Sequence, residues 1–239
     1  MLYQYWYLLS PRYFMWWSNY LIMFLRMLSW PLLICGLLMG LYLSPSDGVQ
    51  GETYRIIYVH VPCAWMCLFL YGVGTMASAL YFITRHPFYG EFIHIALKFG
   101  SIFTFITLVT GSFWGVPMWG TYWAWDARMT SVLVLFLFYV AGLVLYVVIP
   151  VPSKRFLMIS ISTMIGFVNI PIVKYSVNWW YTLHQPSTIS LKNVHIDTSM
   201  LVPLLVMFLF VNIYALKLIL TDLRQYVISK RILKHKSIS

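Results

Sequence analysis

The stretch SVLVLFLFYVAGLVLYVVI, residues 131–149, decides the fold class of this chain. It contains no charged side chain and no proline. Its length is close to the roughly 20 apolar residues that a helix needs to cross a bilayer. A helix pairs its backbone groups internally, which the water-free bilayer core requires. The run, extended back to residue 129, therefore predicts a transmembrane helix.

Similar apolar runs recur along the chain with short polar breaks between them. Of the 239 residues, 61% are hydrophobic and 9% are charged, and the mean hydropathy is +0.79, outside the range of a soluble globular domain. We therefore predict an all-α polytopic membrane protein that forms a single domain over residues 1–239. The expected spans are residues 20–43, 57–83, 92–113, 129–149, 156–173 and 199–220.

The basic residues are distributed asymmetrically over these six spans. Cytoplasmic or matrix loops carry an excess of lysine and arginine. Eleven basic residues fall on the side of the two termini, and only four, namely Arg55, Arg128, Lys174 and Lys192, fall on the other. We therefore expect both termini inside. The basic tail, about residues 221–239, and the net charge of +10 are then explained by topology rather than by nucleic-acid binding. The first run lacks a small-residue cleavage site, so we expect it to be a retained span.

Aromatic residues gather in the loops predicted to lie outside. Residues 117–131 read PMWGTYWAWDARMTS, and six of the eleven tryptophans lie in or beside two outer loops: Trp114, Trp119, Trp123, Trp125, Trp179 and Trp180. If residues 117–126 are helical, one face combines Trp119, Tyr122, Trp123 and Asp126 and forms a platform for a large planar ligand. A simple aromatic belt at the membrane interface is the alternative. Asp126 is also the expected N-cap of the fourth span, and the two roles are compatible.

Two histidines accompany this aromatic segment on the outer side. His60 lies near the start of the second span, and His184 lies in the loop before the sixth. A lone histidine is more often structural, but two neutral imidazoles can fill both axial positions of a haem iron. The porphyrin would rest on aromatic rings, and Arg55 and Arg128 are the nearest outer cations for its propionates. The three cysteines, Cys35, Cys63 and Cys67, are expected to be buried apolar residues rather than a metal site.

Three segments together resemble a known family. They are YRIIYVHVP (residues 54–62), FTFITLVTGSFWGVPMWGTYWAWDARMTS (103–131) and NIPIVKYSVNWWYTLHQ (169–185). The second contains the tryptophan-rich motif WGTYWAWD (119–126). The chain closely resembles the CcmC family of haem-handling proteins in cytochrome c maturation. The resemblance implies haem b held transiently by His60 and His184, and a WWD segment, about residues 114–131, that supports it. It also implies delivery to the haem chaperone CcmE, association with CcmA, CcmB and CcmD, and no enzymatic activity of the chain's own.

Several alternatives and the host membrane stay open on the residues alone. The protein could transport haem through its own spans, carry electrons as a b-type cytochrome, or be a structural subunit of a membrane complex. A transporter usually has ionisable residues inside its spans, and here these are few. The expected location is a bacterial cytoplasmic or mitochondrial inner membrane, with the haem site on the periplasmic or intermembrane-space side. The Phe-, Tyr- and Ile-rich spans favour a mitochondrial host.

Overall fold

The computed structural model describes residues 11–184 and 196–236, which form helices and the loops that join them. The elements are α1 (Pro11–Leu38), the π-helix η2 (Met39–Leu43), the 3-10 helix η3 (Glu52–Ile56), α2 (Ile57–Thr84), α3 (Pro87–Trp119), α4 (Ala127–Val148), α5 (Pro152–Phe167), α6 (Asn169–Trp179) and α7 (Thr198–Lys236). Within the described ranges, six helical stretches are long and apolar enough to cross a bilayer. The predicted all-α class with six spanning helices is confirmed.

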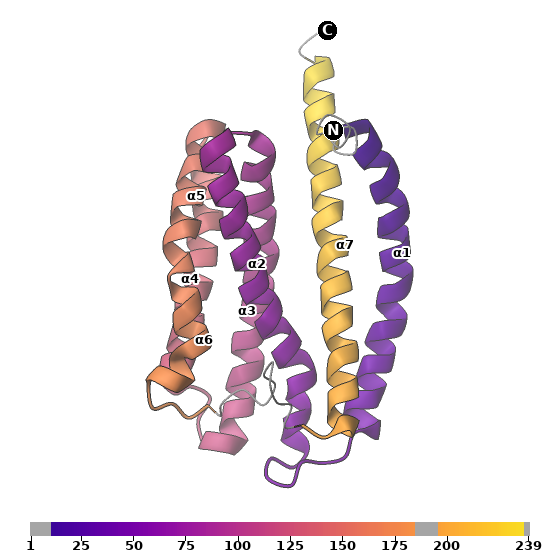
Figure 1. Ribbon diagram of the computed structural model, residues 1–239, viewed down its shortest axis with the longest axis vertical. Coiled ribbons are helices and arrows are strands. Elements are labelled where there is room, and N and C mark those ends of the chain that lie inside the picture. The colour runs from indigo at the N-terminus through magenta and orange to yellow at the C-terminus, as the bar shows by residue number, and fades with distance from the viewer. Residues whose placement is uncertain (1–10, 185–195, 237–239) are drawn as a thin grey trace, which may run out of the picture.

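The helices are arranged as a bundle and a pair. Helices α2 to α6 form the bundle, and α1 and α7 run side by side next to it (Figure 1). Helix α7 joins the pair to the bundle by packing on α2 and α3. The start of α1 and the end of α7 lie at one end of the molecule, which we call the terminal end (Figure 1). The connections from α3 to α4 and from η2 to η3 lie at the opposite end, which we call the histidine end.

Short turns with defined backbone conformations separate the bundle helices. Helix α2 ends at Arg85, whose φ of 54° is left-handed, and α3 begins two residues later at Pro87. The ring of His86 accepts a hydrogen bond from the backbone N–H of Phe88 at 3.3 Å and caps α3. Proline in the first helical turn costs no hydrogen bond, because that N–H has no partner in the helix. The helices extend further into the polar breaks than the predicted spans do.

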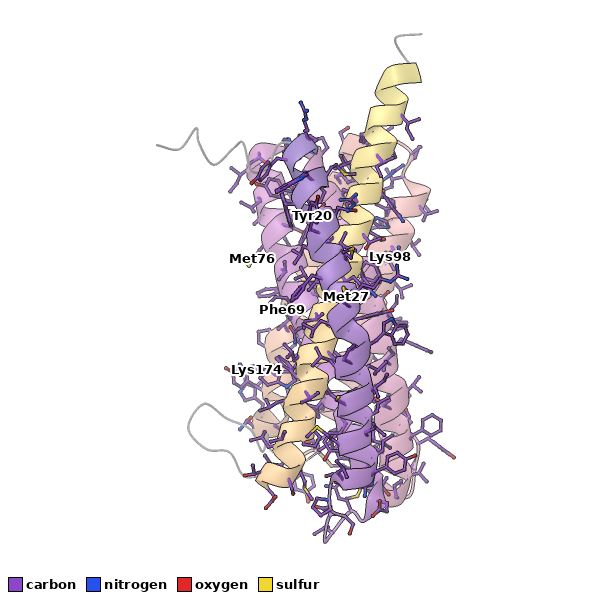
Figure 2. All side chains as sticks on the ribbon, turned by 90° about the vertical axis from the view of Figure 1, so that its right-hand side faces the viewer. Tyr20, Met27, Phe69, Met76, Lys98 and Lys174 are labelled. Carbon is purple, nitrogen blue, oxygen red and sulfur yellow. The ribbon has the colours of Figure 1, made fainter. Side chains whose placement is uncertain are left out.

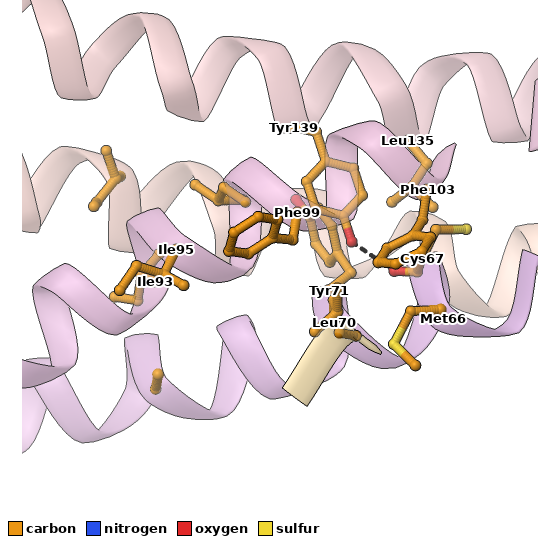
Figure 3. Close-up of a cluster of buried hydrophobic side chains, with 14 of the residues drawn as sticks. Met66, Cys67, Leu70, Tyr71, Ile93, Ile95, Phe99, Phe103, Leu135 and Tyr139 are labelled. Atoms are coloured by element: carbon orange, nitrogen blue, oxygen red, sulfur yellow. Dashed lines mark hydrogen bonds between the residues drawn. The ribbon is translucent and has the colours of Figure 1, made fainter. Parts of the chain in front are cut away.

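Aromatic side chains and small residues lock the bundle together (Figure 3). The rings of Tyr71 and Tyr139 pack edge to face with centroids 5.0 Å apart. The Tyr139 hydroxyl donates to the backbone carbonyl of Cys67 at 2.5 Å, which ties α4 to α2. A Cβ atom at Gly100 would lie 2.2 Å from the Tyr139 ring, so this approach of α3 to α4 requires glycine. Small residues play this role generally where membrane helices pack.

The cysteines agree only partly with expectation. Cys63 and Cys67 are buried in the bundle, as predicted, whereas Cys35 is exposed on the surface of α1. All three are free thiols. Because α1 contributes only one face to the pair with α7, a small apolar residue on its other face is left on the outside of the protein.

Candidate functional site

His60 lies on α2 and packs against one face of α3. Its Nδ1 atom is 3.0 Å from the Thr110 hydroxyl oxygen. That hydroxyl donates its only hydrogen to the carbonyl of Ile106 at 2.7 Å, so towards His60 it acts as an acceptor. A neutral His60 ring therefore carries its proton on Nδ1, which leaves Nε2 unprotonated. The imidazole also meets the Trp114 ring edge to face at 5.6 Å, and a Cβ atom at Gly111 would lie 3.1 Å from it.

His184 comes from the segment that follows α6 and has the same arrangement with a different partner. Its Nδ1 atom lies 2.7 Å from the Oδ2 atom of Asp126. An ionised carboxylate can only accept, so this Nδ1 also carries a proton, and Nε2 is then unprotonated in the neutral ring. Burial lowers the pKa of His184, the Asp126 carboxylate opposes that shift, and the positive charge of Arg128 adds to it. The lowered pKa favours the neutral ring, which is the state that binds metals.

Asp126 connects the start of α4 to His184. Its Oδ1 atom accepts the backbone N–H of Met129 at 2.8 Å and caps α4, as predicted, while Oδ2 holds the imidazole. The predicted helix cap is confirmed, and the second oxygen contacts His184, whereas contact of Asp126 with a ligand or a partner stays a prediction. Arg128 follows in the first turn of α4, and its guanidinium reaches the Ser176 hydroxyl and the Lys174 carbonyl only at 3.5 Å.

Each histidine packs on a tryptophan of α3, His60 on Trp114 and His184 on Trp119. Each imidazole lies within electrostatic reach of the other, and Arg128 lies within reach of both. Trp119 is the last residue of α3, and its ring centroid is 4.7 Å from that of His184. Trp114 stands beside His60, and its indole N–H donates to the side-chain carbonyl of Gln50 at 2.9 Å. The tertiary structure thus brings together segments that are far apart in sequence.

Residues 117–126 do not form one helix, so the predicted helical platform is wrong. Helix α3 ends at Trp119 because Gly120 adopts a left-handed conformation with φ of 73°. The chain then folds back on the helix, since a Cβ atom at Gly115 would lie 2.8 Å from the carbonyl oxygen of Thr121. The predicted single face of four residues is therefore replaced by a helix end and an irregular loop. In that loop the indole N–H of Trp123 is buried without a hydrogen-bond partner among the described residues.

Other predicted site residues have different surroundings. The Arg55 guanidinium pairs with Glu52 and donates to the carbonyl of Gly40 at 2.8 Å. The remaining four aromatic residues expose half or more of their surface at the histidine end: Tyr122, Trp125, Trp179 and Trp180. Their contribution to ligand binding stays a prediction, because a large ligand could cover them.

Sequence reasoning identified Trp114 and Asp126 but missed the other residues that surround His60. Thr107, Thr110 and Gly111 are spaced so that they share one face of α3 with Trp114, and this is the face that meets His60. That spacing is visible in the sequence. Gln50 carried no such signal, because its partner Trp114 is 64 residues away.

Comparison of the sequence with known proteins shows the family of this chain. The family model CcmC, described as heme exporter protein C, matches residues 4–238. The chain belongs to the CcmC family. A putative cytochrome c biosynthesis ccmC-like mitochondrial protein of Marchantia polymorpha is 47% identical over 203 residues, which are 84% of this chain and 86% of that relative. Heme exporter protein C of Bradyrhizobium diazoefficiens is 40% identical over 221 residues, 90% of this chain and 84% of that relative.

A further relative shows how widely the family is distributed. Heme exporter protein C of Escherichia coli K12 is 39% identical over 186 residues, which are 78% of this chain and 75% of that relative. CcmC relatives thus come from bacteria and from mitochondria, and both histidines lie inside the matched range. With six helices able to cross a bilayer and these relatives, the chain is an integral membrane protein.

Proposed function

We propose that this protein binds haem b at the outer surface of its membrane through His60 and His184 and delivers it to the haem chaperone CcmE for cytochrome c maturation. The observation that carries the proposal is that both imidazoles have their Nδ1 atom hydrogen-bonded to an acceptor. Each comes from a different element, each donates from Nδ1 to an acceptor, and each has an unprotonated Nε2 when the ring is neutral. Such outer-shell acceptors fix the tautomer and the ring orientation of metal-binding histidines.

The surrounding residues fit an iron porphyrin. Two side chains are enough for an axial pair, since the porphyrin nitrogens supply the other ligands, and no group of three or more His, Cys, Asp or Glu converges within the described ranges. Trp114 and Trp119 provide apolar rings beside the histidines. The unpartnered N–H of Trp123 and the Arg128 guanidinium, which has no ion pair among the described residues, are donors for propionate oxygens.

The proposal includes an orientation and a division of labour. The bias of basic residues supports an orientation with the terminal end inside and the histidine end outside. The chain supplies coordination, orientation and an exposed edge from which haem can leave, and the bond to the acceptor belongs to the chemistry of the porphyrin and CcmE. CcmA, CcmB and CcmD are the further partners that family membership suggests.

Absorption spectroscopy of the purified full-length protein tests the ligands. We expect a low-spin spectrum with two histidine ligands, and we expect His60→Ala and His184→Ala each to lose most of the bound haem. His94→Ala is the matched control, because this imidazole lies on α3 near the terminal end and stacks on Tyr146. If both site variants keep the wild-type spectrum, the ligand assignment is wrong.

A transfer assay tests the delivery step separately. Wild-type protein and the double variant Trp114→Ala/Trp119→Ala are each expressed with CcmE, and haem on CcmE is measured. We expect the double variant to transfer less haem while its membrane insertion is unchanged. Unimpaired transfer would show that the two tryptophans only form part of an aromatic belt at the membrane interface and do not support haem.

A further inference from the structure

A groove at the terminal end contains a second cluster of ionisable residues. It has a volume of about 410 Å³ and is bounded by α3, α4, α5 and α7. His94 is on its wall, and Thr110, which holds His60, lies 16 residues further along α3, or about 24 Å away at the rise of an α-helix. The groove is therefore separate from the histidine pair.

Both carboxylates of the groove are already engaged. The Tyr146 hydroxyl donates to Glu91, with oxygen distances of 3.0 and 3.2 Å, and the Nδ1 atom of His94 lies 3.4 Å from the same carboxylate. The ammonium group of Lys98, a residue labelled in Figure 2, donates to Asp222 on α7 at 2.7 Å. Asp222 is thus paired with a cation, whereas Glu91 is hydrogen-bonded by the neutral Tyr146 and keeps its negative charge, so the lining has two carboxylates against the three cations Lys98, Arg155 and Lys230.

Two cations of the groove lack such a partner. Arg155 donates to the backbone carbonyls of Ile149 and Pro150 at 2.7 and 3.2 Å, which are uncharged acceptors. The Lys230 ammonium lies 5.5 Å above the Tyr226 ring. Neither has a carboxylate within ion-pairing distance in the part of the chain that the structure describes. The groove therefore carries a net positive charge that is available to a ligand.

The apolar residues of the groove indicate what kind of anion fits. Ile95 and Phe156, both buried, form part of its lining beneath the charged groups. A neighbouring cavity of about 290 Å³ on the other side of the start of α5 adds Arg85 and Lys154. Both cavities lie at the ends of helices that are apolar enough to span a bilayer, where a lipid headgroup would be found.

We propose that the groove between α7 and the start of α5 binds the phosphate headgroup of an anionic phospholipid through Arg155 and Lys230. Basic pockets between membrane helices have the chemistry to bind such headgroups. Arginine and lysine form charge-assisted hydrogen bonds with phosphate oxygens. A bound lipid would bridge α7 to α5 and hold the α1–α7 pair against the bundle at this end.

Native mass spectrometry of the purified full-length protein tests the proposal. The protein is exchanged into detergent micelles that contain equal amounts of phosphatidylglycerol and phosphatidylcholine, and the retained lipids are counted. We expect a preference for phosphatidylglycerol in the wild type. Arg155→Gln/Lys230→Gln should reduce this preference by roughly 30-fold, from the loss of two cations beside the phosphate. The control Lys174→Gln/Lys217→Gln removes the same charge away from the groove and should keep the preference.

A variant that is expected to bind more lipid tests whether lost binding in the double variant comes from misfolding. Asp222→Asn removes the carboxylate that engages Lys98 and so frees a third cation, and it should raise retention of phosphatidylglycerol severalfold. A wild type without a preference, or a double variant that keeps it, overturns the proposal. Displacement of the lipid by inorganic phosphate would assign the groove to a soluble anion and would also overturn it.

Discussion

Asp126 uses its two carboxylate oxygens for two different interactions. One caps α4 at the N–H of Met129, and the other accepts the Nδ1 hydrogen of His184. Asparagine is about as good a helix cap as aspartate. A change to asparagine therefore separates the two roles, because the amide can retain the cap while it changes the hydrogen bond to the histidine.

We predict that Asp126→Asn weakens haem binding without unfolding the protein. An amide N–H facing Nδ1 would favour the tautomer with its proton on Nε2, where the iron has to bind. Loss of such an outer-shell partner typically lowers affinity by about 10- to 100-fold. Haem titration and thermal unfolding measure the two effects. Asp126→Ala should show the same loss of affinity and, in addition, a cap loss of about 1 kcal/mol. Unchanged affinity in Asp126→Asn would contradict this role.

Gly111 gives a second prediction at the scale of a residue. A Cβ atom there would lie 3.1 Å from the His60 ring, so Gly111→Ala should displace the imidazole and weaken haem binding. Alanine stabilises a helix by up to about 1 kcal/mol relative to glycine, so unfolding should not become easier. Gly72→Ala on α2, where a Cβ atom would meet nothing within 4 Å, is the matched control. Equal haem affinity in both variants would show that His60 tolerates the contact.

At the scale of elements, Gly120 determines where α3 stops. Its φ of 73° is costly for any residue with a Cβ atom, by roughly 1 to 2 kcal/mol. We predict that Gly120→Ala lowers the unfolding temperature and loosens the loop that carries Trp123, which should raise the rate of haem loss. Gly48→Ala, in the loop after η2 with open space around its Cβ position, should leave both quantities unchanged. A Gly120→Ala variant that releases haem at the wild-type rate would show that the loop does not contribute to haem retention.

The same elements show what the sequence could predict and what it could not. The six spanning helices follow from apolar length alone, because the bilayer allows few other structures. The end of α3 did not follow, because an aromatic run such as WGTYWAWD continues a helical pattern while one glycine interrupts the backbone. The partners of the histidines lie 50 and 58 residues away, and only packing determines which face of α3 meets α2.

At the scale of the whole molecule, the two ends of the bundle have different chemistry. The histidine end has tryptophans beside two imidazoles, and the terminal end has a groove in which Arg155 and Lys230 form no ion pair with any residue that the structure describes. Helix α1 starts and helix α7 finishes at the terminal end (Figure 1). One measurement of sidedness therefore tests the location of the proposed haem site and of the proposed lipid groove together.

We predict that the terminal end lies on the cytoplasmic side when the protein is produced in bacteria. Eleven basic residues at this end against four at the other should retain it inside, because the lysine and arginine bias determines orientation. A fluorescent protein fused after Ser239 should fluoresce, and alkaline phosphatase fused after Gly48, in the loop that follows the first span, should be active outside. The matched controls exchange the two reporters between these sites and should both be silent. An active phosphatase at the C-terminus would show the opposite orientation. His60 and His184 would then lie inside, where they could not deliver haem to an outer chaperone.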